Sequence, residues 1–235
     1  MRLDQLLVQN GMFKSRSKAI EAIQNKSISV NGVVRKASYK CDGTETIEII
    51  GFVNPYVSRA ALKLEQAIKE YDIDFSNRTV LDVGASTGGF TEVSLKYGAK
   101  TVYAVDVGTL QLVEELKSNP KVISYENTNI LTVNETHFTE GKPNIIVMDV
   151  SFVSIKKIIP YIKQFADEMV VLIKPQFESE GKYLHNGVIR EEKIRVKILN
   201  DVLLYLKEQG LSVKGTVQSP IKGKEGNIEY IAYIK

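Results

Sequence analysis

A glycine-rich turn after a short apolar run constrains the fold of this chain most strongly. The stretch Thr79–Phe90 reads TVLDVGASTGGF and leads into a predicted helix. In doubly wound α/β sheets such a turn holds a nucleotide-like ligand, because glycine lets backbone N–H groups approach the ligand closely. A P-loop is excluded, since Gly89 is followed by Phe90 and not by lysine. The dinucleotide pattern also fails, with Ser86 in place of its second glycine, and a tight turn without a ligand remains the alternative.

Three later apolar runs also end in residues that can contact a ligand, namely Asp106, Asp149 and Lys174. Ligands of open parallel sheets bind outside the carboxyl ends of the strands, so these residues and Asp82 are predicted to lie along one rim. Asp106 comes 22 positions after Gly84, close to the offset at which an acidic residue meets a ribose hydroxyl pair. The alternative is that each polar residue merely ends a strand.

The order of the predicted elements indicates an α/β fold with a mainly parallel sheet. Strands are expected at 79–83, 101–105, 144–148, 169–173, 211–217 and 228–234, and helices at 58–70, 89–97, 109–117, 155–165 and 190–209. The connection 218–227 is too short for a crossover helix, so the last strand should be antiparallel. Glu229, near the start of that strand, is then expected on the same rim.

A lysine interrupts the apolar stripe of the predicted helix at 58–70, whose expected N-cap is Ser58. Lys63 lies three residues after Ala60 and four before Ala67, on the face that should be packed. Lysine is almost never fully buried unless it is paired, so Lys63 should either reach outward or meet a carboxylate.

The rim then combines two lysines with two carboxylates: Lys63, Asp149, Lys174 and Glu229. An aliphatic hydroxyl is a poor nucleophile near neutral pH, and a lysine with a lowered pKa can take its proton or stabilise the forming oxyanion. Burial and a second ammonium lower the pKa of a lysine, whereas adjacent carboxylates raise it. The sequence leaves open which influence is larger.

The N-terminal residues have a different character. Residues 1–40 hold eight lysines and arginines against two acidic residues, while the remaining 195 residues are slightly acidic. Two short helices are expected first, followed by a hairpin through Asn31-Gly32 and a third strand at 46–50. We therefore expect a small domain at 1–50, a linker at 51–57 and a larger domain at 58–235. The basic charge indicates a polyanionic partner, most often nucleic acid.

Composition excludes several classes of protein. Cys41 is the single cysteine, which rules out an internal disulfide and a multi-cysteine zinc or iron–sulfur site. The N-terminus has no apolar signal core, and the apolar runs are far shorter than the ~20 residues that span a bilayer. We expect a cytoplasmic protein that needs neither a membrane nor a metal.

Residues 1–50 resemble the S4 RNA-binding domain. The resemblance is carried by Arg2-Leu-Asp4, by Ser15-Arg-Ser-Lys-Ala19, by Ile28–Gly32 and by Arg35-Lys36. In that family basic residues at helix starts and around a hairpin contact phosphates, which supplies affinity without reading sequence. A solvated basic face is the alternative.

The remainder resembles the FtsJ-like ribose 2′-O-methyltransferases, and the whole chain resembles the TlyA family, in which an S4 domain precedes that enzyme. The segments that carry the resemblance are 58–64, 82–90, 149–152, 174–178, 187–190 and 226–230. The resemblance implies a Rossmann-like class I methyltransferase that uses S-adenosylmethionine. It further implies methylation of a cytidine ribose in ribosomal RNA within ribosomal subunits. The chain stops at Lys235, which is similar to the shorter subgroup restricted to large-subunit RNA, although small-subunit RNA stays open.

The resemblance assigns roles to individual residues. Lys63, Asp149, Lys174 and Glu229 would be catalytic, with Lys174 as the base and the other three positioning it and the ribose hydroxyl. The cofactor residues would be Asp82, Gly84, Ala85, Ser86, Gly88, Gly89, Phe90, Asp106, Val107, Gly108, Thr128, Asn129 and Asp149. The expected RNA contacts are Arg2, Arg16, Lys18, Lys26, Arg35, Lys36, Arg59, Lys222 and Lys224.

Two other functions compete with this interpretation. A ribosome-assembly factor could bind RNA with a vestigial cofactor fold, but binding alone would not require two inward-facing lysines. A membrane-lytic hemolysin, a name attached to some relatives, would need an apolar span or a strongly amphipathic helix, and neither is evident in the sequence.

Overall fold

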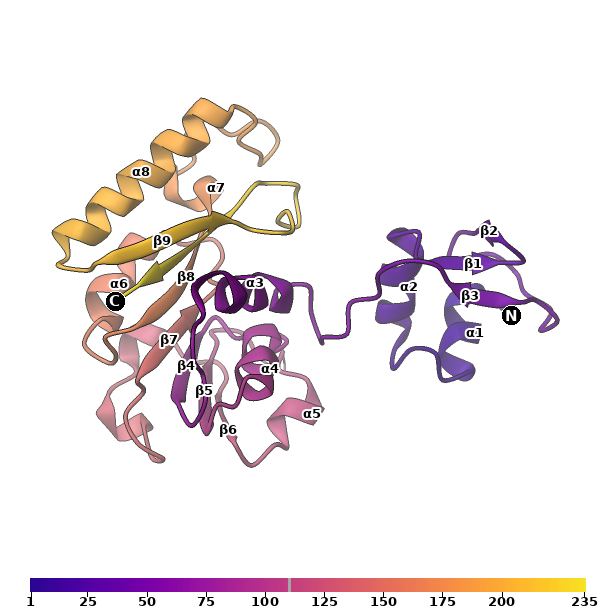
Figure 1. Ribbon diagram of the computed structural model, residues 1–235, viewed down its shortest axis with the longest axis horizontal. Helices are drawn as coiled ribbons and strands as arrows, with labels where there is room; N and C mark the ends of the chain where they lie inside the picture. Colours follow the sequence, from indigo (N-terminus) through magenta and orange to yellow (C-terminus); the bar gives the residue numbers. More distant parts are fainter. Residues whose placement is uncertain (110) are drawn as a thin grey trace. The chain divides into compact units, whose positions relative to one another are not determined.

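A computed structural model describes residues 1–109 and 111–235, and it divides into two compact units, Met1–Pro55 and Tyr56–Lys235 (Figure 1). The division falls inside the predicted linker at 51–57. On the N-terminal side of this division, the Ser27 hydroxyl donates to the Phe52 carbonyl at 2.6 Å. On the C-terminal side, the Val57 amide donates to the Glu92 carboxylate at 2.6 Å. Each unit therefore holds its own end of this segment.

The first unit packs two helices on a three-stranded antiparallel sheet of order β2-β1-β3. Its elements are α1 (Leu3–Gln9), α2 (Arg16–Gln24), β1 (Ile28–Val30), β2 (Val33–Val34) and β3 (Ile47–Ile49). Leu3, Leu7, Ala19 and Ile28 are among the side chains of its core. Asn31 and Gly32 both have positive φ, which confirms the predicted hairpin turn.

A buried carboxylate anchors the start of α1. Asp4 is 0% exposed and accepts hydrogen bonds from the guanidinium groups of Arg2 at 2.9 Å and Arg16 at 2.7 Å. These two hydrogen bonds lower the pKa of Asp4 from its ordinary 3.8 to about 2. Two residues predicted to contact RNA therefore also hold α1 and α2 together.

The depressed pKa of Asp4 predicts an acid-sensitive first unit. Its contribution to the free energy of unfolding should be nearly complete above pH 3.8 and be lost as the pH falls through about 2, where the carboxylate becomes protonated in the folded state. Asp4→Asn should lower the stability of residues 1–55 at neutral pH and leave it nearly unchanged near pH 2. Urea unfolding of the full chain, followed by the amide NMR signals of this unit, checks the prediction. A difference between the two proteins that persists unchanged down to pH 2 would contradict it.

The second unit is built on a mixed sheet whose order, within residues 56–109 and 111–235, is β6-β5-β4-β7-β8-β10-β9. Its strands are β4 (Thr79–Val83), β5 (Thr101–Val105), β6 (Val122–Tyr125), β7 (Ile145–Met148), β8 (Met169–Ile173), β9 (Val213–Gln218) and β10 (Tyr230–Ile234). The α-helices are α3 (Ala61–Tyr71), α4 (Gly89–Lys96), α5 (Glu114–Lys117), α6 (Ile159–Ile162), α7 (Pro175–Glu178) and α8 (Glu192–Glu208). Short 3₁₀ turns occur at η1 (Ile130–Thr132), η2 (Glu135–His137) and η3 (Ile155–Lys157).

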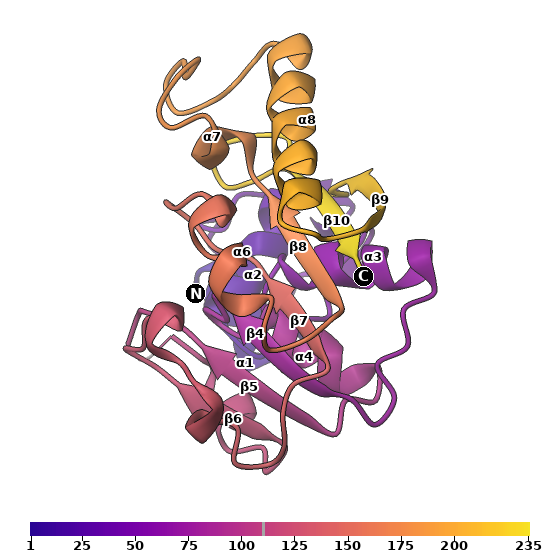
Figure 2. The ribbon, with the colours of Figure 1, turned by 90° about the vertical axis from the view of Figure 1, so that its left-hand side faces the viewer.

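The five strands from β6 to β8 pair in parallel, and β10 pairs antiparallel with both β8 and β9. This arrangement confirms the predicted α/β fold and the antiparallel last strand. Both faces of the sheet are covered, which fits the continuous apolar runs of the parallel strands (Figures 1 and 2). Helices α3 and α4 pack on one face, and α6 and α8 pack on the other.

Two helix predictions were wrong in extent and one strand, β6, was missed. The predicted helix at 109–117 includes Leu110, which lies outside the described residues, and α5 begins only at Glu114 because the Gln111 and Leu112 amides donate to Glu126 instead. The predicted helix at 155–165 is broken into η3 and α6 beside Pro160, which has no N–H to donate. Strand β6 lacked a strong pattern in the sequence.

The expected capping of α3 by Ser58 is also wrong. The residue in the N-cap position of α3 is Ala60, and it makes no side-chain cap. The Ser58 hydroxyl packs on the glycine turn instead: a Cβ added at Gly89 would lie 2.2 Å from it. Ser58 therefore packs on this turn and does not cap α3.

Candidate active site and cofactor pocket

The predicted rim is formed by the carboxyl ends of parallel strands. Asp106, Asp149 and Lys174 directly follow β5, β7 and β8. Strand β10 begins at this same edge, because Tyr230 pairs with Ile173, the last residue of β8. Glu229, the residue before Tyr230, is therefore delivered to the rim by the antiparallel strand.

Asp82 differs from the other predicted rim residues. It lies inside β4, is fully buried and accepts a hydrogen bond from the Thr91 hydroxyl at 2.6 Å. Burial, which disfavours the charged form, raises the pKa of Asp82 to about 7. The side chain ties β4 to α4 beneath the glycine turn and does not line the cavity described below.

The structure brings the two lysines and two carboxylates of the predicted catalytic set together. Lys63 Nζ lies 2.7 Å from Glu229 Oε2 and 3.6 Å from Asp149 Oδ2, and Lys174 Nζ lies 2.5 Å from Asp149 Oδ1. Lys63 and Lys174 are each 6% exposed, and Glu229 is 2% exposed. Lys63 therefore meets carboxylates, the second of the two outcomes expected for it. Asp149 lies between the two ammonium groups and links them into one charged cluster.

Two polar side chains that the sequence interpretation did not select complete the cluster. Lys174 Nζ donates to Ser151 Oγ at 2.9 Å, and Gln176 Nε2 donates to Glu229 Oε1 at 3.1 Å. Both residues stand two positions after a predicted site residue, in segments that the resemblance covers. That proximity was the signal that could have identified them.

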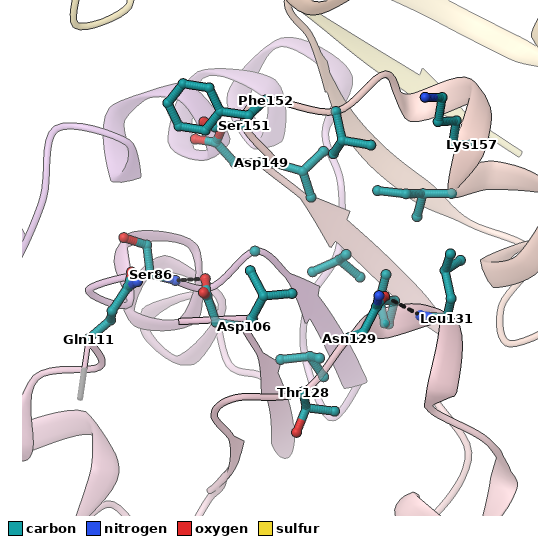
Figure 3. A pocket seen from close by; sticks show the side chains of 18 residues that line it. Ser86, Asp106, Gln111, Thr128, Asn129, Leu131, Asp149, Ser151, Phe152 and Lys157 are labelled. Atoms are coloured by element: carbon teal, nitrogen blue, oxygen red, sulfur yellow. Dashed lines mark hydrogen bonds between the residues drawn. The ribbon is translucent and has the colours of Figure 1, made fainter. Parts of the chain in front are cut away.

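A cavity of about 600 Å³ opens beside this cluster, a size typical of small-molecule sites (Figure 3). Figure 3 shows Asp149, Ser151 and Phe152 on one side of the cavity, with Ser86 and Asp106 across from them. Thr128 and Asn129 supply a hydroxyl and an amide, while Val83, Val105, Ile130 and Leu131 supply apolar wall. Asp149 and Ser151 line the cavity and also contact the lysines, so they connect the two parts of the site.

The predicted cofactor residues fall into two groups. Those that line the cavity are Gly84, Ser86, Asp106, Val107, Thr128, Asn129 and Asp149. Those that are not part of its lining are Asp82, Ala85, Gly88, Gly89, Phe90 and Gly108. The sequence interpretation missed further lining residues, among them Gln111, Val150, Phe152, Val153 and Lys157.

The turn after β4 is held in shape by Gly84 and Asp106. Gly84 has φ +82, and a Cβ there would lie 2.9 Å from the Asp149 carbonyl oxygen. The Asp106 carboxylate accepts hydrogen bonds from the amides of Ser86 at 2.8 Å and Gly108 at 2.7 Å. A carboxylate with two oxygens retains lone pairs for a further donor, such as a ribose hydroxyl. These residues thus fit a nucleoside-containing cofactor.

Most of the predicted RNA contacts are exposed. In the first unit, Lys26 and Lys36 are exposed. Lys18 Nζ lies 3.5 Å from Glu21 Oε2, and the Arg35 guanidinium lies over the Tyr39 ring. In the second unit, Arg59, Lys222 and Lys224 are exposed. Gly223 packs against the catalytic cluster, since a Cβ there would lie 2.5 Å from Glu229 Oε1. The basic loop that contains Lys222 and Lys224 therefore borders the active site.

No helix among the described residues has both the length and the apolar character needed to cross a bilayer. In the same part of the chain, no group of three or more histidine, cysteine or acidic side chains could hold a metal ion.

Comparison with known proteins identifies both units. Residues 56–235 match the FtsJ-like methyltransferase family, and residues 1–47 match the S4 domain. The chain is 36% identical to the 23S rRNA (cytidine-2′-O)-methyltransferase TlyA of Campylobacter jejuni, over 99% of this chain and 98% of that protein. It is 34% identical to the 16S/23S rRNA (cytidine-2′-O)-methyltransferase TlyA of Mycobacterium tuberculosis, over 100% and 89% of the two chains. It is 44% identical to Hemolysin A of Brachyspira hyodysenteriae, over 99% of each.

Solved structures agree with this assignment. A hemolysin candidate from Streptococcus thermophilus is 39% identical and superimposes with a TM-score of 0.79, covering 100% of this chain and 87% of that one. An S-adenosylmethionine-dependent methyltransferase candidate from Listeria monocytogenes, only 15% identical, has a TM-score of 0.53 over 75% and 98% of the two chains, which shows a shared fold alone. The second unit thus has the Rossmann-like fold of class I methyltransferases. This chain belongs to the FtsJ-like methyltransferase family, in the TlyA arrangement that places an S4 domain before the enzyme.

Proposed function

We propose that this protein transfers a methyl group from S-adenosylmethionine to the ribose 2′-hydroxyl of a cytidine in ribosomal RNA, with large-subunit RNA as its main substrate. The observation that carries the proposal is the buried cluster of Lys63, Asp149, Lys174 and Glu229 beside a nucleotide-sized cavity. The activities of the Campylobacter and Mycobacterium relatives support the substrate, because both enzymes are named for 23S rRNA and only the second is also named for 16S rRNA. A ribosomal substrate also supports a cytoplasmic location.

The cavity residues would hold the cofactor. Asp106 would accept from the ribose hydroxyls, while Thr128 and Asn129 would contact the adenosine at the edge of the apolar wall. The backbone of the turn at Gly84 and Ser86 would approach the amino-acid part. When bound, S-adenosylmethionine supplies an activated methyl group on a sulfonium ion. The protein then needs to align the ribose oxygen with that methyl group, and alignment can contribute roughly 7–11 kcal/mol in favourable cases.

Lys174 would take the proton from the ribose hydroxyl. Its Nζ contacts Asp149 and Ser151, both of which line the cavity, so it is oriented toward the place where the hydroxyl would enter. Lys63 and Glu229 would hold Asp149 and the entering ribose in place, because they form the other half of the cluster.

A transfer assay tests the proposed function. Large and small ribosomal subunits, purified from cells that lack this protein, are incubated with the protein and S-adenosylmethionine labelled in its methyl group. We expect label in large-subunit RNA. Label in small-subunit RNA would extend the substrate range, and the absence of label from both RNAs would instead favour the non-catalytic assembly factor.

The first unit would supply affinity for RNA rather than chemistry. Its exposed basic residues and the basic loop beside Glu229 can neutralise phosphates, which makes binding dependent on salt. Deletion of residues 1–55 should weaken binding to ribosomal subunits and leave the affinity for S-adenosylmethionine unchanged. Calorimetry with the cofactor and sedimentation with the subunits measure the two effects. Equal loss of both affinities would contradict separate roles for the two units.

A further inference from the structure

Glu178 is a buried carboxylate beside the active-site cluster that the proposed chemistry does not use. It is the last residue of α7, four positions after Lys174, and only 8% of it is exposed. Its Oε2 accepts from the Ser154 hydroxyl at 2.6 Å, and its Oε1 accepts from the Ile155 amide at 3.0 Å. Each carboxylate oxygen thus accepts from one donor, although burial raises the pKa of Glu178 above its ordinary 4.5.

The segment that Glu178 holds is the wall of the cofactor cavity. Residues 150–153 line the cavity, and Ser151 accepts the hydrogen bond from Lys174. Phe152 has φ +66, a backbone conformation that favours glycine, although it is not a glycine. It is also 91% exposed, so burial of its side chain does not stabilise this conformation. A left-handed conformation at such a residue costs about 1–3 kcal/mol and persists only where the surroundings hold it.

Three contacts from α7 and the residue before it hold this wall. Lys174 Nζ binds Ser151 Oγ at 2.9 Å, and the Phe177 ring lies 5.2 Å from the Phe152 ring. The Glu178 carboxylate then fixes the far end of the segment, where Ser154 also caps η3 through the Lys156 amide. Removing the carboxylate would release one end of the segment while the strain at Phe152 remains.

We propose that Glu178 is a positioning residue for methyl transfer: it holds residues 150–155 against α7, so that Ser151 stays on the Lys174 ammonium and the cavity wall keeps its shape. This role rests on the proposed function. Glu178 contacts neither Lys174 Nζ nor the cavity through its side chain, so it acts through Ser151.

Glu178→Gln tests the role, because the amide nitrogen of glutamine would turn a donor toward either Ser154 or the Ile155 amide. We expect kcat to fall about 100-fold, as small misplacements of reacting groups can cause. The cavity wall should also loosen, so calorimetry should show weaker binding of S-adenosylhomocysteine. Since Glu178 acts through Ser151, the double variant with Ser151→Ala should lose little more than the more damaging single variant.

Glu168→Gln is the matched control. Glu168 is also 8% exposed, and its carboxylate accepts from the Tyr233 hydroxyl and the Arg78 guanidinium. It directly precedes β8, at the end of that strand opposite Lys174. Its loss should lower the melting temperature while kcat and cofactor affinity stay unchanged at temperatures well below unfolding.

Two results would overturn the positioning role. The first is wild-type kcat and wild-type affinity for S-adenosylhomocysteine in Glu178→Gln. The second is a loss of kcat that adds fully to the loss caused by Ser151→Ala. A wild-type protein that methylates no RNA would overturn the proposed function instead, and the affinity comparison between Glu178→Gln and Glu168→Gln would still decide whether Glu178 shapes the cavity.

Discussion

Replacing Lys174 with alanine should lower kcat for RNA methylation by about 10²–10⁴-fold, the range that a positioned acid or base contributes. The variant loses the ammonium group that contacts both Asp149 and Ser151 at the cavity. Asp149 retains Lys63 as an ionic partner, so its largely buried carboxylate, 13% exposed, is not left unpaired and the fold should survive. Single-turnover methylation, together with calorimetric affinity for S-adenosylmethionine, separates the loss of chemistry from any loss of binding.

Lys174→Arg distinguishes a base from a fixed positive charge. Arginine keeps the charge but is not deprotonated in proteins, so a base at this position predicts an activity as low as that of Lys174→Ala. Lys163→Met is the matched control, since Lys163 is a partly buried lysine that donates to the Gln209 carbonyl away from the site. Substantial activity in Lys174→Arg would exclude Lys174 as the base.

Gly84→Ala should damage both stability and catalysis. The new Cβ would lie 2.9 Å from the Asp149 carbonyl oxygen in a backbone conformation with φ +82. The conformation costs about 1–3 kcal/mol and overpacking adds a similar amount. Because relief of the clash moves Asp149, kcat should fall by about 100-fold or more. Urea unfolding and steady-state kinetics measure the two effects.

Gly210→Ala isolates the cost of the backbone conformation. Gly210 has φ +80, nearly the same as Gly84, and no atom lies within 4 Å of the position of its Cβ. The substitution should therefore lower the free energy of unfolding by about 1–3 kcal/mol and leave kcat unchanged. If Gly84→Ala affects activity no more than Gly210→Ala does, the contact between the turn and Asp149 has no catalytic importance.

Much of the rim could be predicted because a parallel sheet gathers the ends of its strands. Asp106, Asp149 and Lys174 each follow an apolar run, and that pattern is visible in the sequence. Lys63 was identifiable for a second reason, since helical periodicity placed a lysine on a packed face. Glu229 followed from the short connection that makes the last strand antiparallel.

The rest of the site depends on segments without a period. The wall at residues 150–153 is irregular, and only tertiary contacts determine that Ser151 meets Lys174 and that Glu178 meets Ser154. A glycine in the sequence indicates that another group approaches the backbone closely, but it does not identify that group. At Gly88 the approaching groups are the side chains of Leu112 and Leu116, and at Gly89 the approaching group is the Ser58 hydroxyl. Sequence alone does not say whether a glycine faces a ligand or the protein.

The position of the transferred methyl group tests the central claim most directly. Ribosomal RNA methylated with S-adenosylmethionine that carries a deuterated methyl group is digested to nucleosides and analysed by mass spectrometry. The lysine–carboxylate cluster beside the cavity predicts deuterated 2′-O-methylcytidine from large-subunit RNA in the wild-type reaction, and its near-complete loss with Lys174→Ala. Deuterium on a base, or a 2′-O-methylcytidine yield that Lys174→Ala does not change, would contradict the account.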